Sequence, residues 1–153
     1  MRSSDLRRRS GAFAEMVTIE QLQQLIGRDS AFTRAYGLVV TAASDGSCTL
    51  SVPYHPHFDR PGGIVSGQVF MIAADVAMWL AIKTLRGLDD PSVTGHMTTD
   101  FLESVSGQAF TCKATVRKLG RRTAFGTAEC ISLNGELLAH HTLTYVVPRG
   151  TAP

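Results

Sequence analysis

The spacing of apolar and polar residues along the chain predicts one long buried helix among shorter elements. The run GGIVSGQVFMIAADVAMWLAI, residues 62–82, is apolar almost all round. From about Gly67 to Leu85 it predicts a helix that is buried on most sides. Ser66 is a suitable N-cap, because its hydroxyl can accept from the free N–H groups of the first turn, and Gly87 fits the end of the helix.

A short amphipathic helix is predicted near the N-terminus, in the stretch TIEQLQQLIGR that begins at Thr18. Thr18 and Gln21 have the spacing of a capping box, in which each side chain bonds the other residue's backbone N–H. Gly27 fits the end of this helix. The apolar residues recur at helical spacing and predict one buried stripe, made of Ile19, Leu22, Leu25 and Ile26.

Two strands are predicted before the long helix and four after it. Residues 37–53 form two strands around Asp45-Gly46, a hairpin signal, and residues 54–63 are a loop with two prolines and two glycines. The later strands span 92–104, 107–119, 122–133 and 136–148, with turns at Ser106-Gly107, Leu119-Gly120 and Asn134-Gly135.

Consecutive hairpins of this kind predict an antiparallel meander. Alternation along the second of the four strands supports it, because Phe110, Cys112, Ala114 and Val116 share one face. One apolar helix beside a long antiparallel sheet predicts an α+β fold, in which the sheet wraps around the helix.

Charge and length indicate a single domain over residues 17–150 with a basic tail before it. The net charge of +2 comes from residues 1–16, and the remainder of the 153-residue chain holds 11 basic and 11 acidic side chains. The Arg- and Ser-rich tail is predicted to be disordered. A neutral domain without a basic face argues against nucleic acid as a partner.

Two further features bear on the compartment. Polar residues and Asp75 interrupt the run Ile64–Ile82, which argues against a membrane span. Three cysteines in strand-like runs, without a C-x-x-C pair, predict buried thiols in a reducing cytoplasm; they are Cys48, Cys112 and Cys130.

Asp75 is the residue that most needs an explanation. It lies inside the apolar helix, and no Lys or Arg occurs within seven positions on either side. A buried carboxylate requires a partner or a function. Asp75 is either a structural residue, bonded to backbone N–H groups or a distant Arg, or a general base or nucleophile.

The start of the same helix offers a complementary feature. Ser66-Gly67-Gln68 presents unpaired backbone N–H groups and the positive end of the helix dipole, which suits a developing oxyanion. Asp75 is eight residues further along, about 12 Å away at the rise of an α-helix. If Gly67 and Asp75 act on one acyl group, they come from two chains, and the sequence predicts a dimer with two equivalent sites.

The motif RPGGIVSGQVFMIAADVAMWLA resembles the central motif of the hotdog-fold acyl-CoA thioesterases, in the PaaI-like branch of the phenylacetate pathway. The resemblance covers residues 18–148 and implies a homodimer that pairs sheet edge to sheet edge, often as a dimer of dimers in a homotetramer. It also implies that Gly67 donates its N–H to the thioester carbonyl and that Asp75 of the other subunit attacks or activates water.

The resemblance also assigns residues around these two. Ser66 replaces the family's His, Gln68 its second Gly and Arg60 its Asn, and all three are expected at the substrate, as is Thr94, which matches a family Ser/Thr near the acid. The turn RKLGRRTAF matches the family's CoA-binding turn and implies contacts from Lys118, Gly120, Arg121 and Arg122.

No cofactor is predicted beyond the coenzyme A of the substrate. The histidines at 55, 57, 140 and 141 have no carboxylate or cysteine at ligand spacing, so no metal site is predicted. Two other functions stay open: an acyl-thioester dehydratase or hydratase, whose usual His is replaced by Ser66, and a non-catalytic acyl-CoA-binding protein. The absence of a serine-hydrolase motif excludes Ser66 as a nucleophile.

Overall fold

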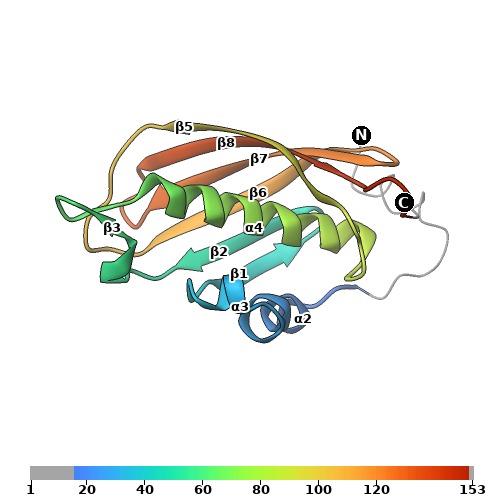
Figure 1. Ribbon diagram of the computed structural model, residues 1–153, viewed down its shortest axis with the longest axis horizontal. Helices are drawn as coiled ribbons and strands as arrows, with labels where there is room; N and C mark the ends of the chain where they lie inside the picture. Colours follow the sequence, from blue (N-terminus) through green and yellow to red (C-terminus); the bar gives the residue numbers. More distant parts are fainter. Residues whose placement is uncertain (1–15, 152–153) are drawn as a thin grey trace.

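The computed structural model describes residues 16–151, so the predicted disordered tail, apart from Met16, lies outside the described residues. Six strands form one antiparallel sheet that curves around the long helix α4 (Gly67–Arg86) (Figure 1). The strands are β1 (Val39–Ser44), β2 (Ser47–Val52), β5 (Val93–Phe101), β6 (Phe110–Leu119), β7 (Thr123–Ser132) and β8 (Leu137–Val146). The predicted α+β class is therefore confirmed.

The sheet has the order β1-β2-β6-β7-β8-β5. The hairpins at Asp45-Gly46, Leu119-Gly120 and Asn134-Gly135 join paired strands as predicted. Asp45 and Gly46 both have positive φ, at 48° and 83°, which is the backbone of a tight hairpin turn.

The predicted hairpin at Ser106-Gly107 is wrong. β5 pairs with β8 at one edge, whereas β6 pairs with β2, so the segment 102–109 crosses the end of the sheet between strands that are not neighbours. Three backbone bonds anchor this crossing: Leu102 N–H and Glu103 N–H both donate to Leu138 O, and Val65 N–H donates to Val105 O. The turn residues are present, but the closure of the sheet around α4 decides which strands pair.

The N-terminal helix covers the other edge of the sheet. α2 (Ile19–Gln24) has the predicted capping box, with Thr18 N–H on Gln21 Oε1 at 2.9 Å and Gln21 N–H on Thr18 Oγ1 at 3.1 Å. The helix does not end at Gly27 but continues as a π-helical turn, η1 (Leu25–Asp29), followed by the short α3 (Ala31–Arg34), which sequence patterning missed.

Gln23 ties α2 to the edge strand β1. Its side-chain amide accepts from Val40 N–H at 2.8 Å and donates to Leu38 O at 3.2 Å, which satisfies backbone groups that an unpaired edge would expose.

The predicted loop 54–63 holds a 3₁₀ turn, η2 (Pro56–Phe58), and leads into a two-stranded ribbon of β3 (Asp59–Arg60) and β4 (Ile64–Val65). This ribbon delivers the chain to the start of α4.

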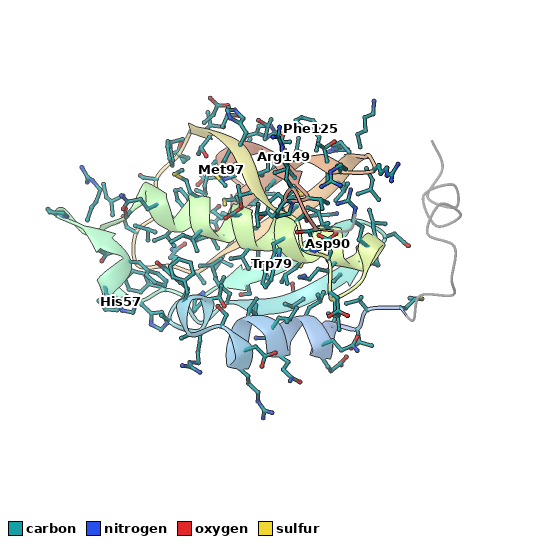
Figure 2. The ribbon with its side chains drawn as sticks, turned by 45° about the vertical axis from the view of Figure 1, so that its right-hand side comes forward. His57, Trp79, Asp90, Met97, Phe125 and Arg149 are labelled. Carbon is teal, nitrogen blue, oxygen red and sulfur yellow. The ribbon has the colours of Figure 1, made fainter. Side chains whose placement is uncertain are left out.

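The core lies between α4 and the concave face of the sheet. The predicted alternation in β6 is confirmed, because Phe110, Cys112 and Ala114 are buried and Lys113 is exposed. All three cysteines are buried free thiols, as predicted. Trp79 of α4 and Met97 of β5, both labelled in Figure 2, are half-buried and pack against this core.

α4 is long and apolar enough to cross a membrane by length and composition, but most of it is buried against the sheet. It keeps one partly exposed stripe, made of Gln68, Met71, Ile72, Asp75 and Trp79. The helix is thus a core helix that leaves a single face, including Asp75, for a further contact.

Candidate active site

The first turn of α4 presents backbone N–H groups without acceptors. Ser66 occupies the N-cap position, with φ −60° and ψ 139°, but its hydroxyl makes no capping bond, so that part of the prediction is wrong. Instead, Ser66 Oγ donates to Gln68 Oε1 at 2.9 Å. Among the described residues nothing accepts from the N–H of Gly67 or Gln68, so both are available to a ligand at the positive end of the helix dipole.

Asp75 is held by two hydroxyl groups rather than by a cation or by backbone N–H groups. Thr94 Oγ1 donates to Asp75 Oδ1 at 2.8 Å, and Tyr145 Oη donates to the same oxygen at 2.6 Å. Tyr145 Oη also lies 2.9 Å from the main-chain oxygen of Asp75. Within residues 16–151, neither structural alternative from the sequence, an Arg partner or backbone N–H groups, is found.

The second carboxylate oxygen of Asp75 is in a different state. Oδ2 receives no hydrogen bond from any described residue, and it is not among the buried atoms that lack a partner, so solvent reaches it. The residue as a whole is half-buried in the single chain. One oxygen is therefore fixed and the other is open to a reactant.

Strand β5 runs antiparallel beside α4 and touches both features. Thr94, near its start, bonds Asp75, whereas Phe101, at its end, has its ring against Gly67. A β-bulge at Gly95 makes this possible, because the register with β8 shifts between Thr94 and His96. The bulge puts Thr94 on the same concave face as Phe101, despite the odd number of positions that separates them.

Gly67 and Asp75 do not meet within one chain. α4 is continuous between them, so its rise separates them by about 12 Å, as the sequence predicted. They nevertheless belong to the same side of the molecule, since both lie along β5, the exposed edge strand of the sheet.

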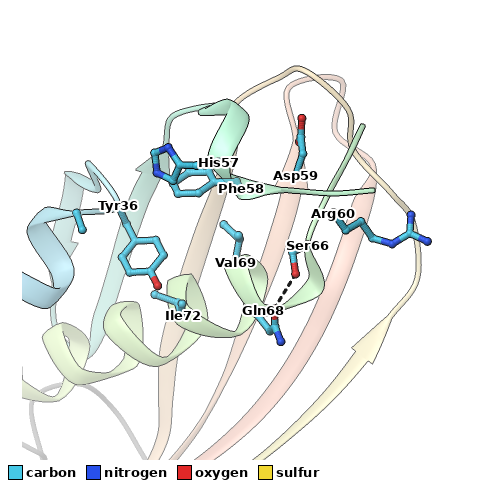
Figure 3. A pocket seen from close by; sticks show the side chains of 10 residues that line it. Tyr36, His57, Phe58, Asp59, Arg60, Ser66, Gln68, Val69 and Ile72 are labelled. Carbon is cyan, nitrogen blue, oxygen red and sulfur yellow. Dashed lines mark hydrogen bonds between the residues drawn. The ribbon is translucent and has the colours of Figure 1, made fainter. Parts of the chain in front are cut away.

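A cleft of about 450 Å³ opens beside the first turns of α4 (Figure 3). Its apolar wall is aromatic and aliphatic, whereas Arg60, Ser66 and Gln68 supply polar groups. Arg60 is exposed, and its guanidinium points outward and bonds Pro61 O at 3.2 Å. His57 and Asp59 add further polar side chains, and the other lining residues are Ala35, Tyr36, Phe58, Val69 and Ile72.

The basic turn between β6 and β7 lies at the other end of α4. Arg86, in the last turn of that helix, donates to Gly120 O at 2.6 Å and fixes the turn. Lys118 and Arg121 are exposed, but Arg122 already bonds the carbonyl oxygens of Val147 and Pro148 at 3.4 and 3.0 Å. The four predicted CoA-binding residues thus share one turn, with one of the three cations partly committed.

The histidines are divided between the cleft, which His57 lines, and the core, where His141 lies. His55 and His57 stack with ring centroids 5.0 Å apart, and His141 is fully buried against Thr99 and Cys130. Within residues 16–151 no group of three His, Cys, Asp or Glu side chains is arranged to hold a metal ion.

Residues 62–139, half of the chain, match the family model described as the thioesterase superfamily. The chain belongs to the thioesterase superfamily. A Thermoplasma acidophilum protein provisionally named an esterase is 25% identical over 130 residues, 85% of this chain and 97% of that one. The family match and this relative support thioester hydrolysis as the general activity.

Solved structures show the same fold. A mutant form of the phenylacetic acid degradation protein PaaI of Thermus thermophilus is similar with a TM-score of 0.71 and 27% identity, over 78% of this chain and 100% of that one. Zebrafish thioesterase superfamily member 2 has a TM-score of 0.78 and 22% identity, over 86% and 99%. The resemblance to PaaI-like thioesterases and the hotdog fold are therefore confirmed.

Within this thioesterase fold, sequence reasoning missed Tyr145. The signal was present in the alternation of β8, where Ala139, His141, Leu143 and Tyr145 are all buried. A buried Tyr hydroxyl needs a hydrogen-bond partner, which could have directed attention to a carboxylate on the helix that β8 faces.

Proposed function

We propose that this thioesterase-superfamily protein hydrolyses an acyl-CoA thioester to the free acid and CoA. One observation carries the proposal: α4 presents unpaired N–H groups at its start and, eight residues on, a carboxylate with one open oxygen, both along the exposed edge strand of the described chain. The first feature stabilises an oxyanion and the second is a base or nucleophile, which are the two groups that thioester hydrolysis needs.

The chemistry uses groups from two chains. The Gly67 N–H of one chain donates to the thioester carbonyl oxygen. Asp75 of the other chain takes a proton from water as the water oxygen attacks the carbonyl carbon; collapse of the adduct breaks the C–S bond, and the thiolate of CoA takes up a proton. The alternative is attack by the Asp75 carboxylate on the carbonyl carbon, which breaks the C–S bond, releases the CoA thiolate and forms a mixed anhydride. Water then hydrolyses the anhydride to the free acid and restores Asp75.

The dimer is proposed to form by pairing β5 with β5 of a second copy. In an antiparallel pair, directly opposite residues point to the same face. A two-fold axis through Thr98 puts Met97 opposite the partner's Thr99 and, because the bulge skips Gly95, Thr94 opposite the partner's Phe101.

Three features support this register. It brings Asp75, which Thr94 contacts, beside the Gly67 that Phe101 contacts in the second copy. It makes use of the Gly95 bulge, without which Thr94 and Phe101 would face opposite sides. It also puts His96 opposite Asp100 of the second copy, and both side chains are exposed in the single chain.

The rest of the substrate follows from the same arrangement. The aromatic cleft beside Gly67 is proposed to hold the acyl group. Lys118, Gly120, Arg121 and Arg122, beside the C-terminal end of α4, are proposed to hold the CoA phosphates. Coenzyme A enters only as part of the substrate, without a further cofactor.

The proposal also includes a dimer of dimers and a cytoplasmic location. Exposed Phe125 and Leu137 on the outer face of the sheet support a dimer of dimers. The three free cysteines support a cytoplasmic location.

The proposal is tested by thiol release from a panel of aromatic, medium-chain and branched acyl-CoAs. Asp75→Asn keeps the acceptor oxygen for Thr94 and Tyr145, so it should fold with an unchanged Tm while kcat falls by about 10²- to 10⁴-fold. Asp89→Asn, on an exposed loop, is the matched control. Binding of acyl-CoA without thiol release would favour the non-catalytic protein, and hydration of an enoyl thioester would favour the dehydratase.

Mixing two inactive variants tests the shared site. Gly67→Pro removes the N–H while Ser66 already has a backbone suited to precede proline. Refolded together with Asp75→Asn, it gives mixed dimers that hold one intact site and one doubly altered site. Random pairing should restore about one quarter of the wild-type activity. No recovery would contradict a site built from two chains.

A further inference from the structure

We propose that Tyr145 is a positioning residue for Asp75. Together with Thr94, Tyr145 holds Oδ1 of the Asp75 carboxylate and leaves Oδ2 as the oxygen that reacts. This inference rests on the proposed thioesterase function. It concerns a residue on β8, outside the sequence motif of α4, that the fold brings to the carboxylate.

The two hydroxyl groups converge because their residues are cross-strand partners. Thr94 of β5 lies directly opposite Tyr145 of β8 in the sheet register, and both side chains face α4. Directly opposite side chains on one face are about 5 Å apart at Cβ. They therefore reach one carboxylate oxygen of the helix above them, and the carboxylate cannot rotate without breaking both bonds.

Tyr145 is a permanent donor in this arrangement. Its side chain is 3% exposed, and burial raises its pKa far above the usual range, with the neighbouring carboxylate of Asp75 adding to the effect. The hydroxyl therefore keeps its proton at neutral pH and can donate it to the carboxylate. Its single proton can serve one acceptor at a time, and the contact with Oδ1, at 2.6 Å, is shorter than that with the main-chain oxygen, at 2.9 Å.

The two carboxylate oxygens of Asp75 therefore have different roles. Oδ1 is saturated by two donors, whereas Oδ2 reaches solvent and receives no hydrogen bond from the described part of the chain. A base or nucleophile gains from such fixation because the reacting atom is already oriented toward the substrate. Loss of the tyrosine hydroxyl should therefore lower turnover without weakening substrate binding.

The experiment measures kcat and KM for Tyr145→Phe, which keeps the ring and removes only the hydroxyl. We expect kcat to fall by about 10- to 100-fold with KM within about twofold of wild type. Thr94→Val should act in the same direction, and Thr94→Ser, which keeps a hydroxyl, should recover most of the loss. Tyr54→Phe removes an equally short tyrosine–aspartate bond, 2.6 Å to Asp59, and shows what the loss of such a bond does to Tm.

An Asp75→Asn background separates positioning from a structural role. If Tyr145 acts through Asp75, Tyr145→Phe should lower the residual kcat of Asp75→Asn no further. An equal loss in both backgrounds, or wild-type kcat in Tyr145→Phe, would overturn the positioning role while the thioesterase function stands. Absence of thiol release by the wild-type protein would overturn both.

Discussion

The ring of Phe101 lies so close to Gly67 that a β-carbon added to this glycine would be 2.8 Å from ring atom Cε1. Phe101 ends the strand that flanks α4, and the residue is 55% exposed in the single chain. The Phe101 ring, and not the backbone conformation, therefore favours glycine at this position, since Gly67 does not have a positive φ. A side chain here would displace the ring of Phe101 from its present position.

Substituting Gly67 by alanine and by proline separates crowding from loss of the N–H. Both add a β-carbon against Phe101, but only Gly67→Pro removes the proposed oxyanion donor. We expect Gly67→Pro to lower kcat by about 10²- to 10³-fold, with a smaller loss in Gly67→Ala.

Steady-state thiol release and Tm for both variants provide the measurement. Phe101→Ala in the Gly67→Ala background should relieve the crowding, and it should not rescue Gly67→Pro. Equal losses in the alanine and proline variants would show that the N–H has no part in the reaction.

The β5 register predicts a specific cross-link. Thr98→Cys places a thiol at the proposed two-fold axis, directly opposite its own copy, and the native cysteines are fully buried. Mild oxidation should give a covalent dimer that a non-reducing gel detects. Lys113→Cys, exposed on an interior strand, is the control. Cross-linking of both variants at one rate, or of neither, would argue against pairing centred on Thr98.

The buried His141 predicts a loss of stability in acid. Burial lowers its pKa from 6.5 to about 4, with His140 adding to the shift and Asp100 opposing it. Between pH 6.5 and about 4, the imidazole of His141 is protonated in the unfolded chain but stays neutral in the folded chain. The free energy of unfolding therefore falls as the pH drops through this range, and it levels off below the folded pKa.

His141→Gln removes the titrating group while it keeps polar atoms near Thr99. The free energy of unfolding, measured by urea titration at several pH values between 6.5 and about 4, should depend less steeply on pH in this variant than in the wild type. This holds whatever the variant's stability at neutral pH. A slope identical to that of the wild type would assign the acid sensitivity to other groups.

Gly126 lies where the packing leaves no room even for a methyl group. An added β-carbon would overlap the terminal methyl of Met78 on α4 and the carbonyl oxygen of Thr115 on β6. Gly126→Ala should therefore destabilise the fold by about 1–3 kcal/mol. Gly27→Ala, whose β-carbon would meet only Gln23 at 3.4 Å, is the control. Thermal or urea unfolding measures both, and equal stabilities would contradict close packing of α4 on β7.

Local signals predicted most elements because each depends on neighbouring residues. The capping box at Thr18, the tight turn at Asp45-Gly46 and the end of α4 at Gly87 are set by side-chain size and backbone freedom, which the sequence records directly. The apolar run of α4 likewise shows that it must be buried. The capping bond predicted for the Ser66 hydroxyl is absent, because this hydroxyl donates to the side chain of Gln68 instead.

The sequence by itself determined the long core helix, the strands around it and the presence of an uncompensated carboxylate with free N–H groups eight residues earlier. Only the tertiary structure decided that β5 leaves β6 and pairs with β8, that a bulge at Gly95 turns Thr94 inward, and that Tyr145 meets Asp75. Periodicity is a local property of a chain, whereas strand order and contacts between residues 70 positions apart depend on how the whole sheet closes around its helix.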